Sequence, residues 1–518
     1  MIRTEQDIEK GKETITPESN QKDVEKANSS KQKSIEQDID EAESSNKPEI
    51  SYQDDDKKFP EILAKMNMLI HIGAESPKFQ RKGEGSCSIF KIPQSLKKIH
   101  HKGYEPEIVS IGPFHHGKEH LQMLEEHKHR YLKLFLGEAK DGLNTNTLGR
   151  KILQIETAIR NSYSEKLVVN KPEFLKMMLL DGCFILMLFF TISRMVRECE
   201  KSPNDPILTT PWILSTIRSD LLLLENQVPL ILLNTLLKES DISDFRSINL
   251  EKLAFKFFNL SMAEKEESQN LEAKHLLDLI RKKFINGTSQ SPKKTPSNSR
   301  HDDSRLILSA KKLRLQGIKF KASHYHSSSK MSCKKIMDYL FYEYSASVPR
   351  RSSQEKKILE IKLNGNELHI PPIVFDEFFS SVLLNCVAFE QLSTKCSNNI
   401  TSYVVFMGCL MNEEADATYL SEKGVIENYF GNGNDLSQFF KVICKDVAFD
   451  MSKSYLKEEF EGINNYTSNR WNVECARFKH LHFDSPWTLL SSFAVLAAIL
   501  LSIIQTIFGG LSYLHHCK

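Results

Sequence analysis

The stretch SPWTLLSSFAVLAAILLSIIQTIFGGLSYL, residues 485–514, decides how the whole chain is organised. It contains no Asp, Glu, Lys, Arg or His. A helix of roughly 20 apolar residues crosses a bilayer core of about 30 Å, and this stretch is longer than that. Trp487 and Tyr513 lie near its two ends, where aromatic rings favour the headgroup region. We therefore expect a single transmembrane helix at 485–514, with a buried core helix as the alternative.

The charges that flank this stretch predict its orientation. Arg470, Arg477 and Lys479 precede it, whereas Lys518 alone follows it. Because positive charge marks the cytoplasmic side of a spanning helix, we expect the main domain to face the cytosol. No apolar run near the N-terminus has the length of a secretory signal, so we expect insertion after synthesis, as a C-terminal anchor. The sequence does not specify which membrane receives it.

The charge of the chain is unevenly distributed. The net charge is +2, but residues 1–58 carry 16 acidic and 10 basic residues, and residues 281–330 carry 13 basic and two acidic ones. Segment 1–58 has too little apolar surface to offset its ordering entropy, so we expect a disordered acidic tail. The basic stretch contains a flexible Ser/Pro/Lys linker at about 286–304. We expect its charge to be solvated, with contact to an anionic leaflet as the alternative.

Apolar spacing between residues 59 and 484 is mostly helical, and a hydrophobic content of 40% is enough for a sizeable core. Short strands are expected at 89–92, 108–111 and 318–322, and a hairpin around an Asn-Gly turn is expected at 358–370. The pattern predicts helices at 59–72, from 121 onward, and at 174–195, 271–284, 306–315, 375–392, 400–411, 435–446 and 453–464, and two more that meet at 225–229.

The helix expected at 174–195 is apolar nearly all round and could be a second membrane span. Lys176, Asp181 and Arg194 interrupt it, which favours a buried helix instead. The predicted fold class is therefore mainly α with small β elements (α+β). It comprises the disordered tail, a large helical domain at 59–484, the single C-terminal transmembrane helix and a short tail at 515–518.

The ten cysteines show no CxxC and no regular spacing, and Cys183 and Cys386 have apolar neighbours. This pattern predicts a disulfide-free cytosolic protein. Cys517 lies beside the expected membrane helix, where S-palmitoylation is an alternative. Asn-X-Ser/Thr sequons occur at residues 28, 259, 286, 399 and 465, and they are chance matches if the domain faces the cytosol.

Several blocks of sequence follow one another in a recognisable order. They include IFKIPQSLKKIHHKGYEPEIVSIGPFHHG (89–117), EEHKHRYLKLFL (125–136), MMLLDGCFIL (177–186), DLLLLENQVPL (220–230), KHLLDLIR (274–281), LLNCVAFEQL (383–392), ITSYVVFMGCL (400–410) and HFDSPW (482–487). Together they resemble the plant-specific DUF247 family, also called UPF0481, over roughly residues 85–515. The resemblance implies a single-pass membrane protein with a largely helical domain and no assigned biochemical activity.

The association of some grass members of that family with self-incompatibility loci implies recognition rather than catalysis. This chain departs from the usual pattern at Leu124, Met187, Leu188 and Leu230. These are changes in packing residues and leave the resemblance intact, but they argue against transferring the role of any one member.

Five histidines, His115, His116, His120, His127 and His129, are the strongest candidates for a metal site. His116 and His120 have the i,i+4 spacing that places two imidazoles on one helix face. Gly117 lies between them at an expected turn, and no third ligand follows from the spacing. Contacts in turns, caps and at the surface are therefore expected instead.

Asp181 and Glu225 could form a buried acid pair, because a carboxylate in apolar surroundings needs a partner or a shifted pKa. The simpler expectation is that each caps a helix or pairs with a core Lys or Arg, and the same holds for Glu390 and Gln391. There is no Walker loop, dinucleotide-binding glycine motif, GxSxG elbow or HExxH. We therefore assign no catalytic, cofactor-binding or metal-binding residue.

Three functions are compatible with these observations. The first is a tail-anchored membrane protein whose helical domain binds other proteins in recognition or signalling, with no nucleic-acid partner because the basic stretch lacks a reading module. The second is an uncharacterised enzyme that uses Asp181, Glu225 or the 115–129 histidines. The third is an exported recognition protein of the self-incompatibility type, for which the sequons are the support.

Overall fold

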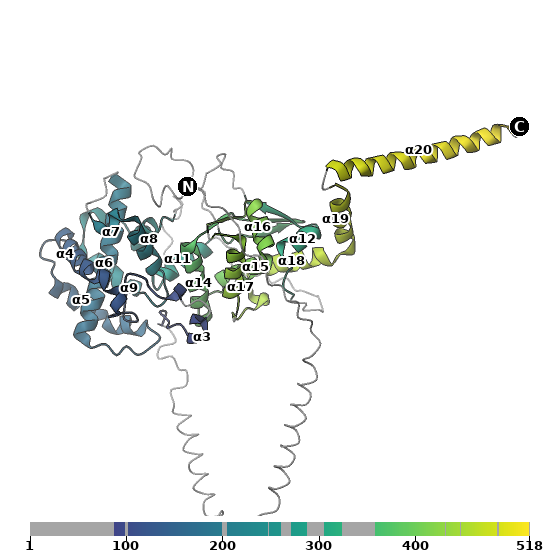
Figure 1. Cartoon of the computed structure of the whole chain (residues 1–518). Helices are drawn as coiled ribbons and strands as arrows, with labels where there is room; N and C mark the ends of the chain where they lie inside the picture. The colour runs from purple at the N-terminus through teal and green to yellow at the C-terminus, as the bar shows by residue number, and fades with distance from the viewer. Residues whose placement is uncertain are drawn as a thin grey trace, which may run out of the picture. The chain divides into compact units, whose positions relative to one another are not determined.

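The computed structural model describes residues 87–98, 102–198, 205–246, 248–260, 271–286, 305–323, 358–429, 431–445, 447–483 and 486–516 (Figure 1). Helices dominate these residues, and their strands are short and pair in two small sheets. The predicted fold class, mainly α with small β elements, is confirmed. The predictions for 1–58 and 59–72 and for nearly all of 286–304 lie outside the described residues.

A long buried helix, α6 (Lys171–Glu198), forms the centre of the first half of the domain. It is apolar on every side, so each of its faces needs cover from water. The helices that pack against it are α4 (Glu125–Glu138), α5 (Thr145–Asn161), α9 (Leu230–Ser240) and α10 (Leu250–Phe257). In its most apolar window 83% of the residues are buried, which confirms the predicted buried helix at 174–195.

The second half of the domain is built on α14 (Glu377–Leu392), which contacts α15 (Asn399–Leu410). Next, α17 (Gly433–Ile443) packs on α15, and α16 (Glu414–Glu422) packs on α17. The two halves are joined by α11 (Leu276–Ile285), which contacts α10 on one side and both α14 and α15 on the other (Figure 1). The helices predicted at 271–284, 375–392, 400–411 and 435–446 are thus confirmed, with ends shifted by up to five residues.

One small sheet contains the predicted hairpin. β2 (Lys362–Asn364) runs antiparallel to β3 (Glu367–Ile370), and β1 (Lys319–Ala322) adds to β3 in parallel, which confirms the strand predicted at 318–322. Asn364 pairs with Glu367, so the two-residue loop is Gly365–Asn366, one position later than the predicted Asn-Gly turn. Gly365 has a φ of 64°, the conformation that such a tight loop requires.

A second sheet was not predicted from the sequence. β4 (Ile373–Phe375) pairs in parallel with β5 (Ile426–Asn428). The predicted helix at 375–392 therefore begins too early. The Asp376 side chain accepts the N–H of Phe379 at 2.8 Å and caps α14, so the backbone before it is free to remain extended.

Two of the predicted strands are wrong. Ile89 forms only a single parallel bridge to Tyr163, and residues 108–111 pair with no strand. Their apolar pattern does mark buried segments of chain. A strand also needs a neighbouring backbone to bond with, and here side chains take that role, as described below.

Three helix predictions need correction. The two helices predicted to meet at 225–229 do not meet there. α8 (Pro211–Asp220) ends at residue 220, and 221–229 is a turn-rich connection to α9. At 306–315 the helix is only α12 (Ala310–Leu315). The helix expected from residue 121 begins as a 3₁₀ turn, η2 (Glu119–Leu124), and continues as α4.

The remaining elements complete the described chain. They are α3 (Gln94–Lys97), η1 (Lys102–Tyr104), α7 (Pro206–Thr209), η3 (Ser243–Phe245), η5 (Met451–Lys453), α18 (Lys457–Ser468), α19 (Arg470–Phe483) and α20 (Pro486–His516). The helix predicted at 453–464 corresponds to α18, displaced by four residues. The apolar stretch 485–514 is helical as α20, which continues into the predicted tail 515–518 as far as His516.

Candidate functional site

Buried polar side chains gather around the connection between α8 and α9. The Asp220 carboxylate accepts the N–H groups of three successive residues, 107–109, at 2.9, 2.9 and 3.0 Å. Asn226 accepts the N–H of Ile111 at 2.7 Å and donates to the carbonyl of Val109 at 3.0 Å. These side chains replace the partner strand that was expected beside 108–111. Despite the N–H donors, burial raises the pKa of Asp220 to about 6.

Glu225 joins the same connection to the start of the described chain. One of its oxygens accepts the N–H of Ile92 at 2.6 Å, and the other lies 2.7 Å from Lys97 Nζ. His115 Nε2 is 3.4 Å from that second oxygen. Burial alone would raise the pKa of Glu225, but His115, Lys97 and the N–H group outweigh it and lower that pKa. Glu225 is therefore held as a carboxylate by His115, Lys97 and a backbone N–H group.

Asp181 lies in the middle of α6 and has a different cation. Its Oδ1 is 2.7 Å from Lys128 Nζ of α4, and its Oδ2 accepts the N–H of Gly112 at 2.8 Å. Burial lowers the pKa of Lys128, but the carboxylates of Asp181 and Glu125 outweigh that effect and raise it. Burial raises the pKa of Asp181, and the ammonium opposes the rise. Asp181 and Glu225 thus form separate pairs with core lysines, as the simpler expectation predicted.

Glu390 on α14 is fully enclosed and serves as both a cap and an ion-pair partner. Its Oε1 is 2.8 Å from Arg281 Nε, and its two oxygens accept the N–H groups of Ile400 and Thr401 in the first turn of α15. Arg281 also donates to the carbonyl of Ser397. The cap and the pair with arginine expected for Glu390 are both confirmed.

Gln391, the neighbour of Glu390, bonds to backbone. Its Oε1 accepts the N–H of Ala448 at 2.9 Å, and its Nε2 donates to the carbonyl of the same residue at 3.2 Å. The side chain thus ties α14 to the segment after α17.

His275, at the start of the helix that contains Arg281, is also buried and was not singled out from the sequence. It is the N-cap of α11: its Nδ1 accepts the N–H of Asp278, and its Nε2 lies 3.0 Å from the carbonyl of Ser88. These partners require a neutral ring with its proton on Nε2. Burial, the largest cause, lowers the pKa of His275 to about 4.

The histidines considered as metal ligands, and not assigned as such, lie in separate surroundings. His115 is buried beside Glu225, whereas His116 lies near the surface with Nε2 3.8 Å from Glu173. Gly117 adopts a φ of 81°, in keeping with the expected turn. His120 lies in η2, and His127 and His129 lie in α4. Over the described part of the chain, no three His, Cys, Asp or Glu side chains are grouped to hold a metal ion.

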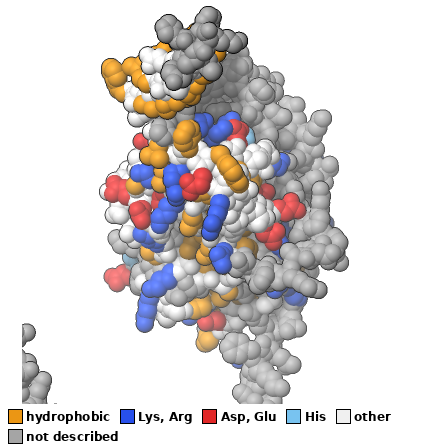
Figure 2. All heavy atoms as spheres, turned by 90° about the vertical axis from the view of Figure 1, so that its right-hand side faces the viewer, with side chains coloured by type: hydrophobic (Ala, Val, Ile, Leu, Met, Phe, Trp, Pro, Cys, Tyr) orange, Lys and Arg blue, Asp and Glu red, His pale blue; other side chains and the backbone are white. Residues whose placement is uncertain are grey.

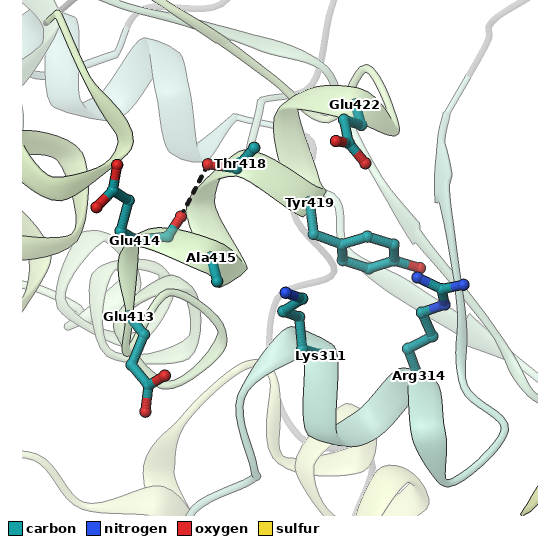
Figure 3. Close-up of a pocket in the computed structure, with 8 residues that line it drawn as sticks. All are labelled: Lys311, Arg314, Glu413, Glu414, Ala415, Thr418, Tyr419 and Glu422. Carbon is teal, nitrogen blue, oxygen red and sulfur yellow. Dashed lines mark hydrogen bonds between the residues drawn. The ribbon is translucent and has the colours of Figure 1, made fainter.

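A surface pocket of about 600 Å³ lies between α12 and α16. Lys311 and Arg314 extend from α12, and Glu413, Glu414 and Glu422 belong to α16 and its cap (Figure 3). The Arg314 guanidinium lies over the Tyr419 ring, 5.3 Å from its centre. The residues that line this pocket do not include Asp181, Glu225, Glu390 or any of the histidines singled out in the sequence.

The lysines and arginine that neutralise the buried acids are what sequence reasoning missed. Lys97, Lys128 and Arg281 are all nearly inaccessible to water. One signal was available for Lys128 and Arg281, because a cation on an otherwise apolar helix face is a candidate for a buried pair, but the four-residue helix of Lys97 has no such face. Which acid each one meets depends on tertiary contacts and has no local signature.

Two described helices are long and apolar enough to cross a membrane: α6 and the stretch Leu490–Ser512 of α20. They differ in burial, because most of α6 lies inside the fold and none of the α20 window does. The chain is thus a largely helical protein whose core pairs Asp181, Glu225 and Glu390 with buried cations, and its C-terminal apolar helix is exposed.

The comparison with known families agrees with this architecture. The DUF247 model, described as a plant protein of unknown function, matches residues 89–502, so the chain belongs to that family. It is 45% identical to UPF0481 protein At3g47200 of Arabidopsis thaliana, over 84% of this chain and 89% of the relative. It is also 22% identical to the UPF0481 protein At3g02645 of the same plant, over 81% and 88% of the two chains. No solved structure matches it.

Proposed function

We propose that this protein is a membrane-anchored recognition module: α20 spans a bilayer, and the helical domain binds other proteins on the cytosolic side. The exposure of α20 is the observation that carries the proposal. Twelve large apolar side chains between Leu490 and Leu511 are exposed. Leaving them in water would cost roughly 20 kcal/mol or more, and a bilayer core removes that cost.

A binding role for the domain is supported by what its buried acids do. Asp181, Glu225 and Glu390 each face a buried cation and accept backbone N–H groups. Carboxylates fixed in this way hold segments of chain together and are screened from any substrate in solution. Their arrangement favours a rigid scaffold with functional surfaces on its outside over an enzyme that uses these acids.

The anchor is tested by carbonate extraction of membranes that contain the full chain. The variant Leu496→Arg/Leu500→Arg places two charges in α20, each of which costs about 2.5–3.5 kcal/mol at a membrane centre. Leu134→Arg/Leu153→Arg is the matched control, because both residues are exposed on the domain. The wild type and the control should remain in the pellet and the α20 variant should be extracted. A wild-type chain that carbonate extracts would refute the anchor.

The side of the membrane is tested by protease treatment of sealed microsomes, with glycosidase digestion of the same samples. A cytosolic domain is digested without detergent and carries no glycan. Protection together with a glycan on the exposed sequons Asn259 or Asn465 would instead establish the exported alternative.

The recognition role is tested by proximity labelling in plant cells. The label is fused to the full chain or, as a control, to residues 485–518 alone, so that both report from the same membrane. Proteins marked only by the full chain should bind the purified full-length protein directly. Identical labelling by the two fusions would contradict the proposal.

A further inference from the structure

The helix that precedes α20 exposes an apolar stripe. α19 ends at Phe483 and α20 begins at Pro486. The exposed fractions of Trp471, Phe478 and Leu481 are 78%, 58% and 64%. Their spacing, with exposed Cys475 between the first two, places them on one side of the helix. Exposed apolar groups that gather in this way mark an interaction surface.

The opposite side of α19 packs on the domain. His480 Nε2 lies 3.1 Å from the carbonyl of Arg314 at the end of α12. Ala476 approaches Gly317 so closely that a Cβ at that glycine would lie 3.0 Å from the Ala476 Cβ. The outward direction of the stripe is therefore set by contacts on the other face.

Basic residues flank the stripe. Arg470 and Arg477 fall on one side of it and Lys479 on the other, by the rotation of about 100° per residue that 3.6 residues per turn gives. Arg477 pairs with Glu474 at 3.0 Å. Three cations and one acid leave α19 with a net charge of +2. An apolar face bordered by Lys and Arg is the pattern of a helix that lies in a membrane interface.

Segment 305–323 adds more positive charge beside α19. It holds six Lys and Arg residues and no acid. α12 of this segment contacts α19, and the Asn464 side chain of α18 donates to the carbonyl of Arg305 at 2.7 Å. Lys319 and Lys321 pair with Glu367, and Lys311 and Arg314 line the pocket that also holds Glu413, Glu414 and Glu422. Leu306 and Leu315 are exposed. Figure 2 shows this end of the domain, with Lys and Arg side chains among hydrophobic ones and acidic side chains between them.

We propose that α19 and segment 305–323 form a surface that lies on the bilayer spanned by α20, with Trp471, Phe478 and Leu481 at the acyl boundary and the basic residues at anionic headgroups. This inference rests on the proposed membrane anchor. Two observations support it. Only two residues separate α19 from α20, so α19 must lie close to the bilayer, and the surface carries positive charge. In this proposal segment 305–323 of the basic stretch contacts lipid, whereas the sequence alone suggested that the stretch is solvated.

Tryptophan quenching tests the surface, because the chain has three tryptophans in three settings: Trp212 on α8, Trp471 on α19 and Trp487 at the start of α20. Full-length variants that keep one Trp and replace the other two by Phe are reconstituted into vesicles. The vesicles contain phosphatidylcholine brominated near the headgroup end of its chains and about 30% phosphatidylserine, which gives a negative surface. We expect quenching of Trp471 and Trp487, a blue-shifted emission for Trp471, and no quenching of exposed Trp212.

The outcomes separate this inference from the proposed function. Quenching of Trp487 but not of Trp471 would overturn the inference and leave the anchor intact. If Trp487 is not quenched, the anchor fails and the inference fails with it. Equal quenching of Trp471 in vesicles without phosphatidylserine would overturn the role of anionic headgroups.

The charges are tested in the chain that retains Trp471 alone. Arg470→Glu/Lys479→Glu should remove at least about half of the quenching of Trp471, because each cation near the surface contributes to its attraction. Lys441→Glu/Lys445→Glu is a matched control, since both residues lie in and just after α17, away from α19 in the chain. Equal effects of the two variants would contradict a specific surface on α19.

Discussion

Lys128 Nζ and Asp181 Oδ1 lie 2.7 Å apart, and each side chain is 1% exposed. Asp181→Leu would leave the ammonium buried with only Glu125, which is 24% exposed, as an acidic partner. Removal of one member of a buried pair costs about 3–5 kcal/mol, so we expect a loss of that size in the free energy of unfolding. Denaturant unfolding of the full chain in detergent, followed by circular dichroism, measures it.

The double variant Lys128→Met/Asp181→Leu provides the control for that loss. It removes both charges and should be less destabilised than Asp181→Leu alone, because no uncompensated charge remains. Glu125→Gln should cost about 1 kcal/mol or less, as expected for a partly exposed ion pair. A double variant as unstable as the single one would show that packing, not charge, dominates at this position.

His275 should make the fold sensitive to acid. Its pKa is lowered to about 4 by burial, whereas an unfolded histidine has a pKa of about 6.5. Between these values the unfolded chain binds a proton that the folded chain does not, so stability falls as pH decreases from about 6.5 to about 4. The full effect is about 3 kcal/mol. His275→Asn keeps an N-cap acceptor without a titrating group, so its unfolding free energy should depend less on pH over this interval.

Replacement of glycine by alanine should have opposite effects on stability at two positions. Gly182→Ala in α6 places a Cβ against Leu236 of α9, and overpacking of this kind costs about 1–3 kcal/mol. Gly137→Ala in α4 meets no atom within 4 Å and should stabilise by about 1 kcal/mol, through helix propensity. Thermal unfolding of the two full-length variants checks both signs. Stabilisation by both would mean that α6 and α9 are less closely packed than described.

The cysteines should differ widely in reactivity. Burial raises the pKa of the Cys183 and Cys386 thiols far above the usual range, and both are inaccessible. Cys475 is exposed on α19. Peptide mapping after brief maleimide treatment of the folded chain in detergent should show Cys475 modified, and Cys183 and Cys386 modified only after denaturation. Rapid labelling of Cys183 would contradict the burial of α6.

The parts of the fold that sequence predicted well are those with a local signature. The apolar runs at 174–195 and 485–514 can each be recognised from consecutive residues alone, and so can the hairpin turn at Gly365. The separate lysine partners of Asp181 and Glu225 were harder to predict from the sequence. Lys97 and Glu225 are 128 positions apart, and no spacing rule connects them.

The failed strand at 108–111 has the same physical origin. Its residues are buried, but Asp220 and Asn226 bond to their backbone from across the fold. The sequence near residue 110 carries no information about such distant side chains. The contact between α12 and α19 likewise had no signal in the sequence, and the expectation that the basic stretch is solvated stays a prediction.

The position of α6 in the chain has a consequence for synthesis. α9 and α10, which cover it in the finished domain, follow it, and α10 ends at Phe257. At about 5–20 residues per second, roughly 3–12 s pass between the emergence of α6 and that of its last cover. During that interval α6 presents an apolar run like that of α20 to the machinery that inserts membrane helices. Lys176, Asp181 and Arg194 within it make insertion of α6 into a bilayer less favourable, a penalty that the uncharged run of α20 does not carry.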